Sequence, residues 1–389
     1  MTSIRIKQTL ALIRISMAGV LDRAGSAIVV AVSVGCAAGI LVSMLSIGAG
    51  IRDMTVRNVR GDRAIATAME GSMVAFTREK ARTIAGLPGI RKSAEGNALA
   101  SADAMVSVKA RRASDGAKSN LTIVGMGAEF QQVYPEIRVT DGRAFRAGMR
   151  EVMVGENARG LYRGLNIGDR ITYQGTQWQV VGAFAANGGL AESWLLTDAQ
   201  TLMTAFDLTG YHQMTIRLES PSAFSTLAEA MKHIPALGIK LEPESEVRER
   251  EARSLSGMVN FLSYFIGSIM AAGAMMGALN SMYAMIEARR RDFATLRALG
   301  FRSTGIATAV LTEAIMLAAP GAIIGALIPW LIFNGNPVTF VGLNFSLAVS
   351  WELVAIGVLW AMTVGVAGGI IPAANAARTP IATGLRLDN

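Results

Sequence analysis

Four long apolar segments constrain the fold of this chain more than any other feature. They cover residues 24–50, 254–286, 305–333 and 353–372, and Glu313 is the only charged side chain among them. Each segment supplies the roughly 20 residues that an α-helix needs to cross the hydrocarbon core of a bilayer. We therefore expect a membrane α-helical protein with four transmembrane helices.

The rest of the chain is too polar for the whole protein to be membrane-embedded. Of the 389 residues, 51% are hydrophobic and 17% are charged, and a polar stretch of about 200 residues, 51–253, separates the first two apolar segments. Within it, short strand-like runs alternate with helical ones, and residues 170–184 have the pattern of a hairpin that turns at Gly175. This pattern predicts an inserted α+β domain with stalk-like ends and two subdomains.

Charge placement predicts how the chain crosses the membrane. The loop 287–304 carries five arginines and only two acidic residues, and both terminal segments are also basic. Under the positive-inside rule these three parts are cytoplasmic, while 51–253 and the loop 334–352 lie on the far side. The segment 1–23 is expected to be an amphipathic interfacial helix, and 373–389 a cytoplasmic tail. The net charge of +8 is explained by this topology, so nucleic acid is not an expected partner.

The basic loop 287–304 has its own internal pattern. Phe293, Leu296 and Leu299 recur at helical spacing, which indicates a short amphipathic helix. Gly300 suits the C′ position that ends such a helix, with the apolar Phe301 after it. The apolar face needs something to pack on, and three supports stay open: the membrane surface, the core of the protein, or a cytoplasmic partner.

Small residues recur along the apolar segments at helical spacing. Rows of this kind let membrane helices approach closely, so we expect packing seams there, and we expect the first two spans to carry a dimer contact. The residues singled out for membrane packing are Gly35, Gly39, Gly267, Ala271, Gly357 and Gly365.

Two further local patterns give expectations about helix ends. The stretch 244–253 places glutamates four residues before arginines three times, as in Glu244 and Arg248, which predicts an exposed helix with i,i+4 ion pairs leading into the second span. Pro372 is expected to end the fourth span, because proline interrupts helices.

Motifs of enzymes and metal sites are missing from the sequence. There is no Gly-x4-Gly-Lys-Ser/Thr loop to hold ATP phosphates, the two histidines are isolated, and the single cysteine, Cys36, lies in the first apolar segment. We expect no enzyme activity, no metal site and no directly bound cofactor. Glu313 is a candidate for intramembrane coupling, but its position near the end of the span favours structural pairing, at the interface or with an arginine, as its role.

Three sequence stretches resemble the MacB/FtsX-type ABC-transporter permeases. Residues 287–301, EARRRDFATLRALGF, are similar to the coupling segment of that family. LTEA at 311–314 followed by PGAIIG at 320–325 is similar to its third span, and PAANAARTP at 372–380 with Leu385 and Arg386 is similar to its ending. Residues 151–184 resemble part of the outer domain of the family more loosely.

The resemblance implies a type VII, mechanotransmitter-class permease in the bacterial inner membrane, with a MacB-like periplasmic core domain. Its partners would be a cytoplasmic ABC ATPase that binds ATP and Mg²⁺, a second permease copy in a homodimer or heterodimer, and, in some members, a periplasmic adaptor and an outer-membrane channel. The expected function is export or efflux driven by that ATPase. Lipoprotein release and FtsX-like regulation of a cell-wall hydrolase are the alternatives within the family, and a membrane sensor without nucleotide coupling is the alternative outside it.

By its resemblance to that coupling segment, the helix in 287–304 is expected to contact the ATPase. The residues assigned to this contact are Arg291, Phe293, Leu296, Arg297, Leu299 and Gly300.

Overall fold

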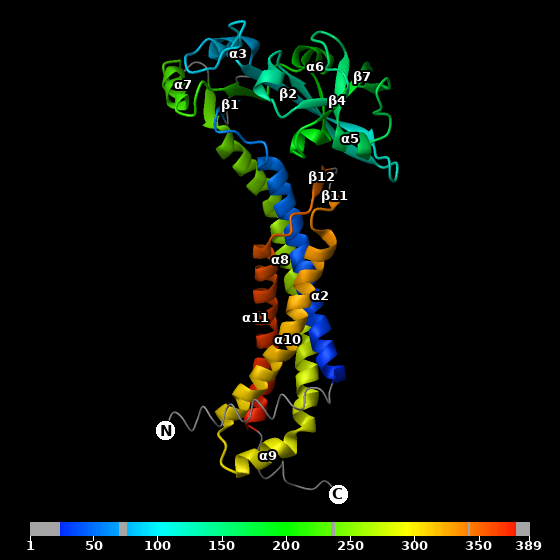
Figure 1. Cartoon of the computed structure of the whole chain (residues 1–389), viewed down its shortest axis with the longest axis vertical. Helices are drawn as coiled ribbons and strands as arrows, with labels where there is room; N and C mark the ends of the chain where they lie inside the picture. The colour runs from blue at the N-terminus through cyan, green and yellow to red at the C-terminus, as the bar shows by residue number, and fades with distance from the viewer. Residues whose placement is uncertain (1–23, 70–75, 235–237, 341–342, 379–389) are drawn as a thin grey trace. The chain divides into compact units, whose positions relative to one another are not determined.

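The structure of the protein is a computed structural model, which describes residues 24–69, 76–234, 238–340 and 343–378. The chain divides into two compact units. One consists mainly of the long helices and is called the membrane unit; the other, residues 50–255 with the hairpin at 337–346, is called the outer unit (Figure 1). The interfacial helix expected at 1–23 and the last part of the expected tail lie outside the described residues.

Four helices in the described residues are long and apolar enough to cross a membrane. They are α2 (Ala24–Val56), α8 (Glu244–Ala288), α10 (Ser303–Phe333) and α11 (Trp351–Arg378). Many of their large apolar side chains are exposed, as with Phe261, Leu331 and Leu359, which suits contact with lipid. With the sheet domain inserted after the first of these helices, the expected fold class is confirmed.

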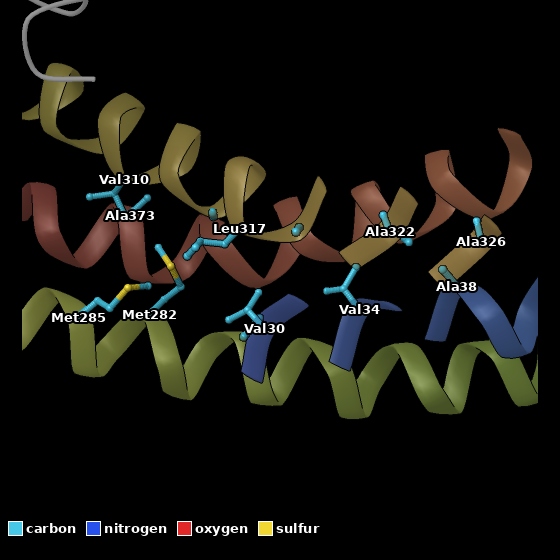
Figure 2. Close-up of a cluster of buried hydrophobic side chains, with 14 of the residues drawn as sticks. Val30, Val34, Ala38, Met282, Met285, Val310, Leu317, Ala322, Ala326 and Ala373 are labelled. Carbon is cyan, nitrogen blue, oxygen red and sulfur yellow. The ribbon is translucent and has the colours of Figure 1, made fainter. Parts of the chain in front are cut away.

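The helices of the membrane unit pack around one core of medium and small side chains. Figure 2 shows Val30, Val34 and Ala38 of α2 in this core, together with Met282 and Met285 of α8. Leu317, Ala322 and Ala326 of α10 and Ala373 of α11 belong to the same core. Small side chains such as these alanines allow close helix–helix contact, because membrane helices associate through van der Waals packing.

The fourth long helix differs from the sequence expectation at Pro372. The helix α11 does not end at this proline but continues to Arg378, and Pro372 is buried inside it. A proline removes one backbone hydrogen bond, yet neighbouring helices in a membrane bundle can support the helix around it. The following residues, Ala373, Ala374 and Asn375 onward, are mostly alanines, which favour continued helix.

The outer unit is built on one sheet with the strand order β10-β1-β9-β2-β3-β8-β5-β7-β4, with β6 beside β7. The strands are β1 (Arg63–Ala68), β2 (Ala100–Arg111), β3 (Lys118–Met126), β4 (Arg138–Gly142), β5 (Glu151–Gly155), β6 (Arg170–Tyr173), β7 (Thr176–Ala185), β8 (Trp194–Asp198), β9 (Gln213–Arg217) and β10 (Ile239–Pro243). The long strand β2 belongs to two lobes, because its residues 100–103 pair with β9 and its residues 104–111 pair with β3.

Helices cover the two lobes separately. In the first lobe, α3 (Arg78–Ala85) and α7 (Ala223–Lys232) contribute Ile84 and Leu227 to a core with β1 and β9. In the second lobe, α5 (Glu156–Leu161) and α6 (Ala199–Ala205) pack in a core around Trp178, and α4 (Phe130–Val133) packs in another with Phe184. The outer unit thus has three cores on one sheet, one in the first lobe and two in the second, and the two subdomains expected from the sequence stay a prediction.

Of two hairpins in the described residues, one follows from its local sequence and the other was not expected from it. Gln174 and Gly175, both at positive φ, join β6 to β7, as two-residue type I′ turns require. A second hairpin, β11 (Pro337–Phe340) with β12 (Leu343–Ser346), lies in the stretch expected to be only a loop, 334–352.

Candidate functional site

The basic loop after α8 forms the short helix α9, Arg290–Ala298, separated from α8 by a break at Arg289 (Figure 1). Gly300 follows it at φ 91°, and the amides of Gly300 and Phe301 donate to the carbonyl oxygens of Arg297 and Leu296, both at 3.0 Å. This is the Schellman arrangement, which needs a residue in the left-handed region at C′ and therefore favours glycine.

The apolar residues of α9 and its C-cap residue Leu299 do not share one exposed face. Phe293 is 5% exposed in the core of the membrane unit, and Leu296 packs against that core from a half-buried position. Leu299, in contrast, is 71% exposed. Phe293 and Leu296 pack against the core because burial there removes their apolar surface from water. Of the residues assigned to a partner, Arg291, Leu299 and Gly300 remain exposed and Arg297 is half-buried.

An ion pair fixes the start of α9 to α10. The Nη1 atom of Arg289 lies 3.5 Å from Oε2 of Glu313, whose side chain is 7% exposed. The guanidinium of Arg289 also lies 5.5 Å from the centroid of the Phe293 ring, a cation–π contact. Glu313 thus pairs with Arg289 and connects the α8–α9 junction to the third span.

The small residues of the first span face the third span of the same chain. A Cβ atom added to Gly35 would lie 2.9 Å from the carbonyl oxygen of Gly321, and one added to Gly39 would lie 2.9 Å from that of Gly325. Side chains at these two positions would force α2 and α10 apart. These glycines are therefore already covered within the chain. The dimer contact expected of the first two spans stays a prediction, and it would have to use other residues.

The other small residues singled out from the sequence have ordinary neighbours within the membrane unit. Gly267 lies against Leu41, and Gly365 lies against Ala318. Gly357 lies against Val42 and Ala326, while Ala271 is half-buried on α8. The spans therefore contact one another through small residues at several points.

Sequence reasoning missed a buried arginine in the outer unit. Arg63, at the start of β1, is 1% exposed, and its Nε and Nη1 atoms lie 2.8 Å and 2.7 Å from carboxylate oxygens of Glu244 and Glu136. It also donates to the carbonyl oxygens of Asn58 and Val133. Arg63 therefore joins the segment after α2, the first turn of α8 and the segment around α4.

Glu244 is the α8 member of this cluster, which we call the Arg63 cluster: Arg63, Glu136 and Glu244. Burial raises the pKa of Glu244, and the charge of Arg63 opposes that rise. The amide of Arg60 also donates to the Glu244 carboxylate at 3.0 Å. The sequence offers only an arginine at the start of a short strand, which is too common to identify a buried ion pair.

The i,i+4 pairs expected at the start of α8 form only in part. Arg253 lies 3.6 Å from Glu249 as expected, but Arg248 pairs with Glu251 and Arg250 pairs with Glu242 of β10. Glu244 pairs with Arg63 instead of Arg248. Tertiary partners displace helical pairs here because isolated i,i+4 pairs contribute only about 0.3–0.5 kcal/mol.

The comparisons with known proteins agree with this architecture. The MacB-like periplasmic core domain matches residues 27–234, and the FtsX-like permease C-terminal domain matches residues 264–381. The uncharacterized ABC transporter permease YknZ of Bacillus subtilis is 21% identical over 80% of this chain and 79% of its own length.

Two further relatives are larger proteins. The macrolide export ATP-binding/permease protein MacB of Sodalis glossinidius is 22% identical over 87% of this chain, and the pyoverdine export ATP-binding/permease protein PvdT of Pseudomonas entomophila is 26% identical over 59%. The chain spans 54% and 35% of their lengths. With more than half of its residues in the first domain match, the chain belongs to the MacB-like family of ABC-transporter permeases, as a multi-pass membrane protein with a periplasmic domain.

Proposed function

We propose that this permease lies in the bacterial inner membrane and couples ATP hydrolysis by a partner ATPase to movement of its periplasmic domain, with export as the result. The ATPase would bind ATP and Mg²⁺, because this sequence has no phosphate-binding loop. The export names of MacB and PvdT support the direction of transport.

The observation that carries the proposal is the way α9 is held. Phe293 and the Arg289–Glu313 pair attach this helix to the membrane unit, while Arg291 and Leu299 stay exposed. A helix that is attached to the membrane unit on one side and is basic on the other can bind a cytoplasmic protein. Movement of that protein would then be transmitted through the helix to the spans. The exposed Leu299 offers an apolar contact, and exposed arginines orient an acidic partner.

The periplasmic end of the proposed relay is the Arg63 cluster. The helices α2 and α8 each have residues in both units. Arg63 links the residues that follow α2 to the first turn of α8. In a dimer, movement of these two helices would reach the sheet through that link. A periplasmic adaptor and an outer-membrane channel are further proposed partners of the permease.

The test is co-purification of the partner ATPase with single variants of α9. We expect Leu299→Asp to lower ATPase retention strongly while leaving thermal stability unchanged, because the side chain is exposed. Leu299→Met is the matched control and should retain the ATPase. If Leu299→Asp retains the ATPase at the wild-type level and with an unchanged hydrolysis rate, α9 is only a surface helix and the coupling proposal fails.

Cysteine labelling tests the proposed orientation separately. Single cysteines at Ser114 in the outer unit and at Thr304 after α9, in a Cys36→Ser background, are treated with an impermeant thiol reagent on spheroplasts. Both positions are exposed. We expect labelling at 114 only, and labelling at 304 only would reverse the topology.

A further inference from the structure

The outer unit contains a cavity of about 370 Å³, within the size range of small-molecule pockets. Its walls come from the last turn of α2, the first three turns of α8 and the strands β2, β3 and β8. The apolar part of the lining includes Met54, Met105, Met126, Trp194 and Leu255. Methionine and tryptophan side chains adapt to differently shaped apolar ligands, which makes these walls a suitable apolar container.

The polar part of the lining is acidic. Four carboxylates line the cavity: Asp103, Glu136, Glu244 and Glu251. Arg248 is the basic residue in the lining, and its Nη1 atom donates to Glu251 at 2.8 Å. Arg63, which is not part of the lining, pairs with both Glu136 and Glu244. The four carboxylates therefore outnumber the two guanidinium groups by two, and this excess of negative charge favours a cation over an anion inside the cavity.

Asp103 is the innermost of these carboxylates. It is 1% exposed, and its two oxygens accept hydrogen bonds from Ser101 Oγ at 2.5 Å and from the Tyr134 hydroxyl at 2.7 Å. Burial raises the pKa of Asp103 to about 6, against the effect of these hydrogen bonds. Its negative charge is stabilised only by neutral donors and by the more distant Arg248.

We propose that this cavity binds a small amphipathic cation, an amine carried on an apolar body. The apolar body would lie against the methionines and Trp194, and the amine would face the carboxylates of Asp103 and Glu251. Anions are disfavoured by the same carboxylates, and neutral apolar molecules gain only the apolar contacts.

Because of the position of the cavity, ligand binding should also affect the ATPase cycle, an expectation that rests on the proposed function. Residues of α2, α8 and the sheet all touch this space. A molecule that fills it resists rearrangement of these elements against one another, so it slows any cycle that needs such movement. The bound amine should therefore lower the ATPase rate of the complex.

The experiment compares three ligands with the same body: 4-phenylbutylamine, 4-phenylbutanol and 4-phenylbutanoate. Binding to the full chain in lipid nanodiscs is measured by calorimetry, with empty nanodiscs subtracted. We expect the amine to bind about tenfold more tightly than the carboxylate, a difference of about 1.4 kcal/mol, with the alcohol between them.

Two variants and a matched control locate the binding. Glu251→Gln should weaken amine binding several-fold, whereas Glu249→Gln, on the same helix but outside the lining, should leave it unchanged. Ala191→Trp fills the cavity and should abolish binding of all three ligands, with folding checked by thermal unfolding. The proposal is overturned if the amine binds no more tightly than the carboxylate, if binding equals that of empty nanodiscs, or if it survives Ala191→Trp.

The ATPase measurement separates this inference from the proposed function. If the wild-type permease does not alter the ATPase rate at all, the proposed function fails, while the binding measurement still decides the cavity. If the permease stimulates the ATPase and the bound amine leaves the rate unchanged, the assigned consequence is wrong.

Discussion

The membrane unit and the outer unit of this permease are stabilised by different physical means. In the membrane unit, α2 meets α10 where Gly35 faces Gly321 and Gly39 faces Gly325, so helix backbones approach closely. In the outer unit, a fully buried arginine satisfies two carboxylates and two carbonyl oxygens. Adding a side chain at these glycines should therefore lower the stability of the membrane unit, and removing the charge of the buried arginine should lower the stability of the outer unit.

The largest effect is expected for Arg63→Ala. The change leaves the buried Glu244 and the partly buried Glu136 without their cation, and breaking a buried ion pair costs about 3–5 kcal/mol. We expect a large fall in the unfolding temperature of the outer unit, read by limited proteolysis during heating. Arg57→Ala is the control, because Arg57 pairs with Asp53 at the surface, where such pairs contribute about 0–1 kcal/mol. Equal stability of the two variants would contradict the buried-charge account.

The second effect is a pH dependence that comes from Asp103. Burial raises its pKa from 3.8 to about 6, so the folded chain binds a proton that the unfolded chain releases between these values. This group therefore contributes stability that is present below pH 4 and is lost as the pH rises through about 6. Two pKa units correspond to about 3 kcal/mol.

Asp103→Asn tests this dependence because it removes the titration at similar size. We expect thermal unfolding curves between pH 4 and pH 7 to show a weaker loss of stability in the variant than in the wild type. Glu95→Gln, an exposed change elsewhere in the outer unit, should leave the profile unaltered. If the wild-type and Asp103→Asn profiles coincide, Asp103 does not titrate in this range.

The third effect tests close approach in the membrane unit. Gly35→Leu places a side chain against the Gly321 backbone and should cost about 1–3 kcal/mol, the usual range for overpacking. Gly273→Leu is the matched control, because a Cβ there meets nothing within 4 Å. Thermal unfolding in nanodiscs should separate the two variants. An unaffected Gly35→Leu protein would mean that α2 and α10 do not pack as described.

Sequence patterns predicted the membrane fold better than the sites. Long runs of apolar residues depend on local composition alone, so the four spans followed from them, while the alternation of strand-like and helical runs predicted the inserted α+β domain. The position of the α9 end also follows locally, because Gly300 is placed for a left-handed C′ residue. The predicted end of the fourth span at Pro372 was wrong, because the local sequence does not show that neighbouring helices support the helix around this proline.

The contacts of individual side chains could not be predicted in the same way. Phe293, Leu296 and Leu299 have the same spacing, yet the tertiary fold buries the first and exposes the last. The partners of Arg63 lie 73 and 181 residues away in the chain. No local pattern specifies such a pairing, and the acidic cavity next to it depends on the same long-range arrangement.

The smallest effect sharpens the comparison by separating the two uses of glycine. Gly300 has open space around its Cα, unlike Gly35, so a side chain there meets no neighbour and only the backbone angle of φ 91° opposes it. A left-handed conformation costs an ordinary L-residue about 1–2 kcal/mol, and asparagine tolerates it better than alanine. We expect Gly300→Ala to speed hydrogen exchange of the Gly300 and Phe301 amides, Gly300→Asn to do so less, and the global unfolding temperature to stay nearly constant in both. If Gly300→Ala lowers the global stability as much as Gly35→Leu does, the strain is not local to the end of α9, and the distinction between glycines needed for close approach and glycines needed for backbone conformation does not hold in this protein.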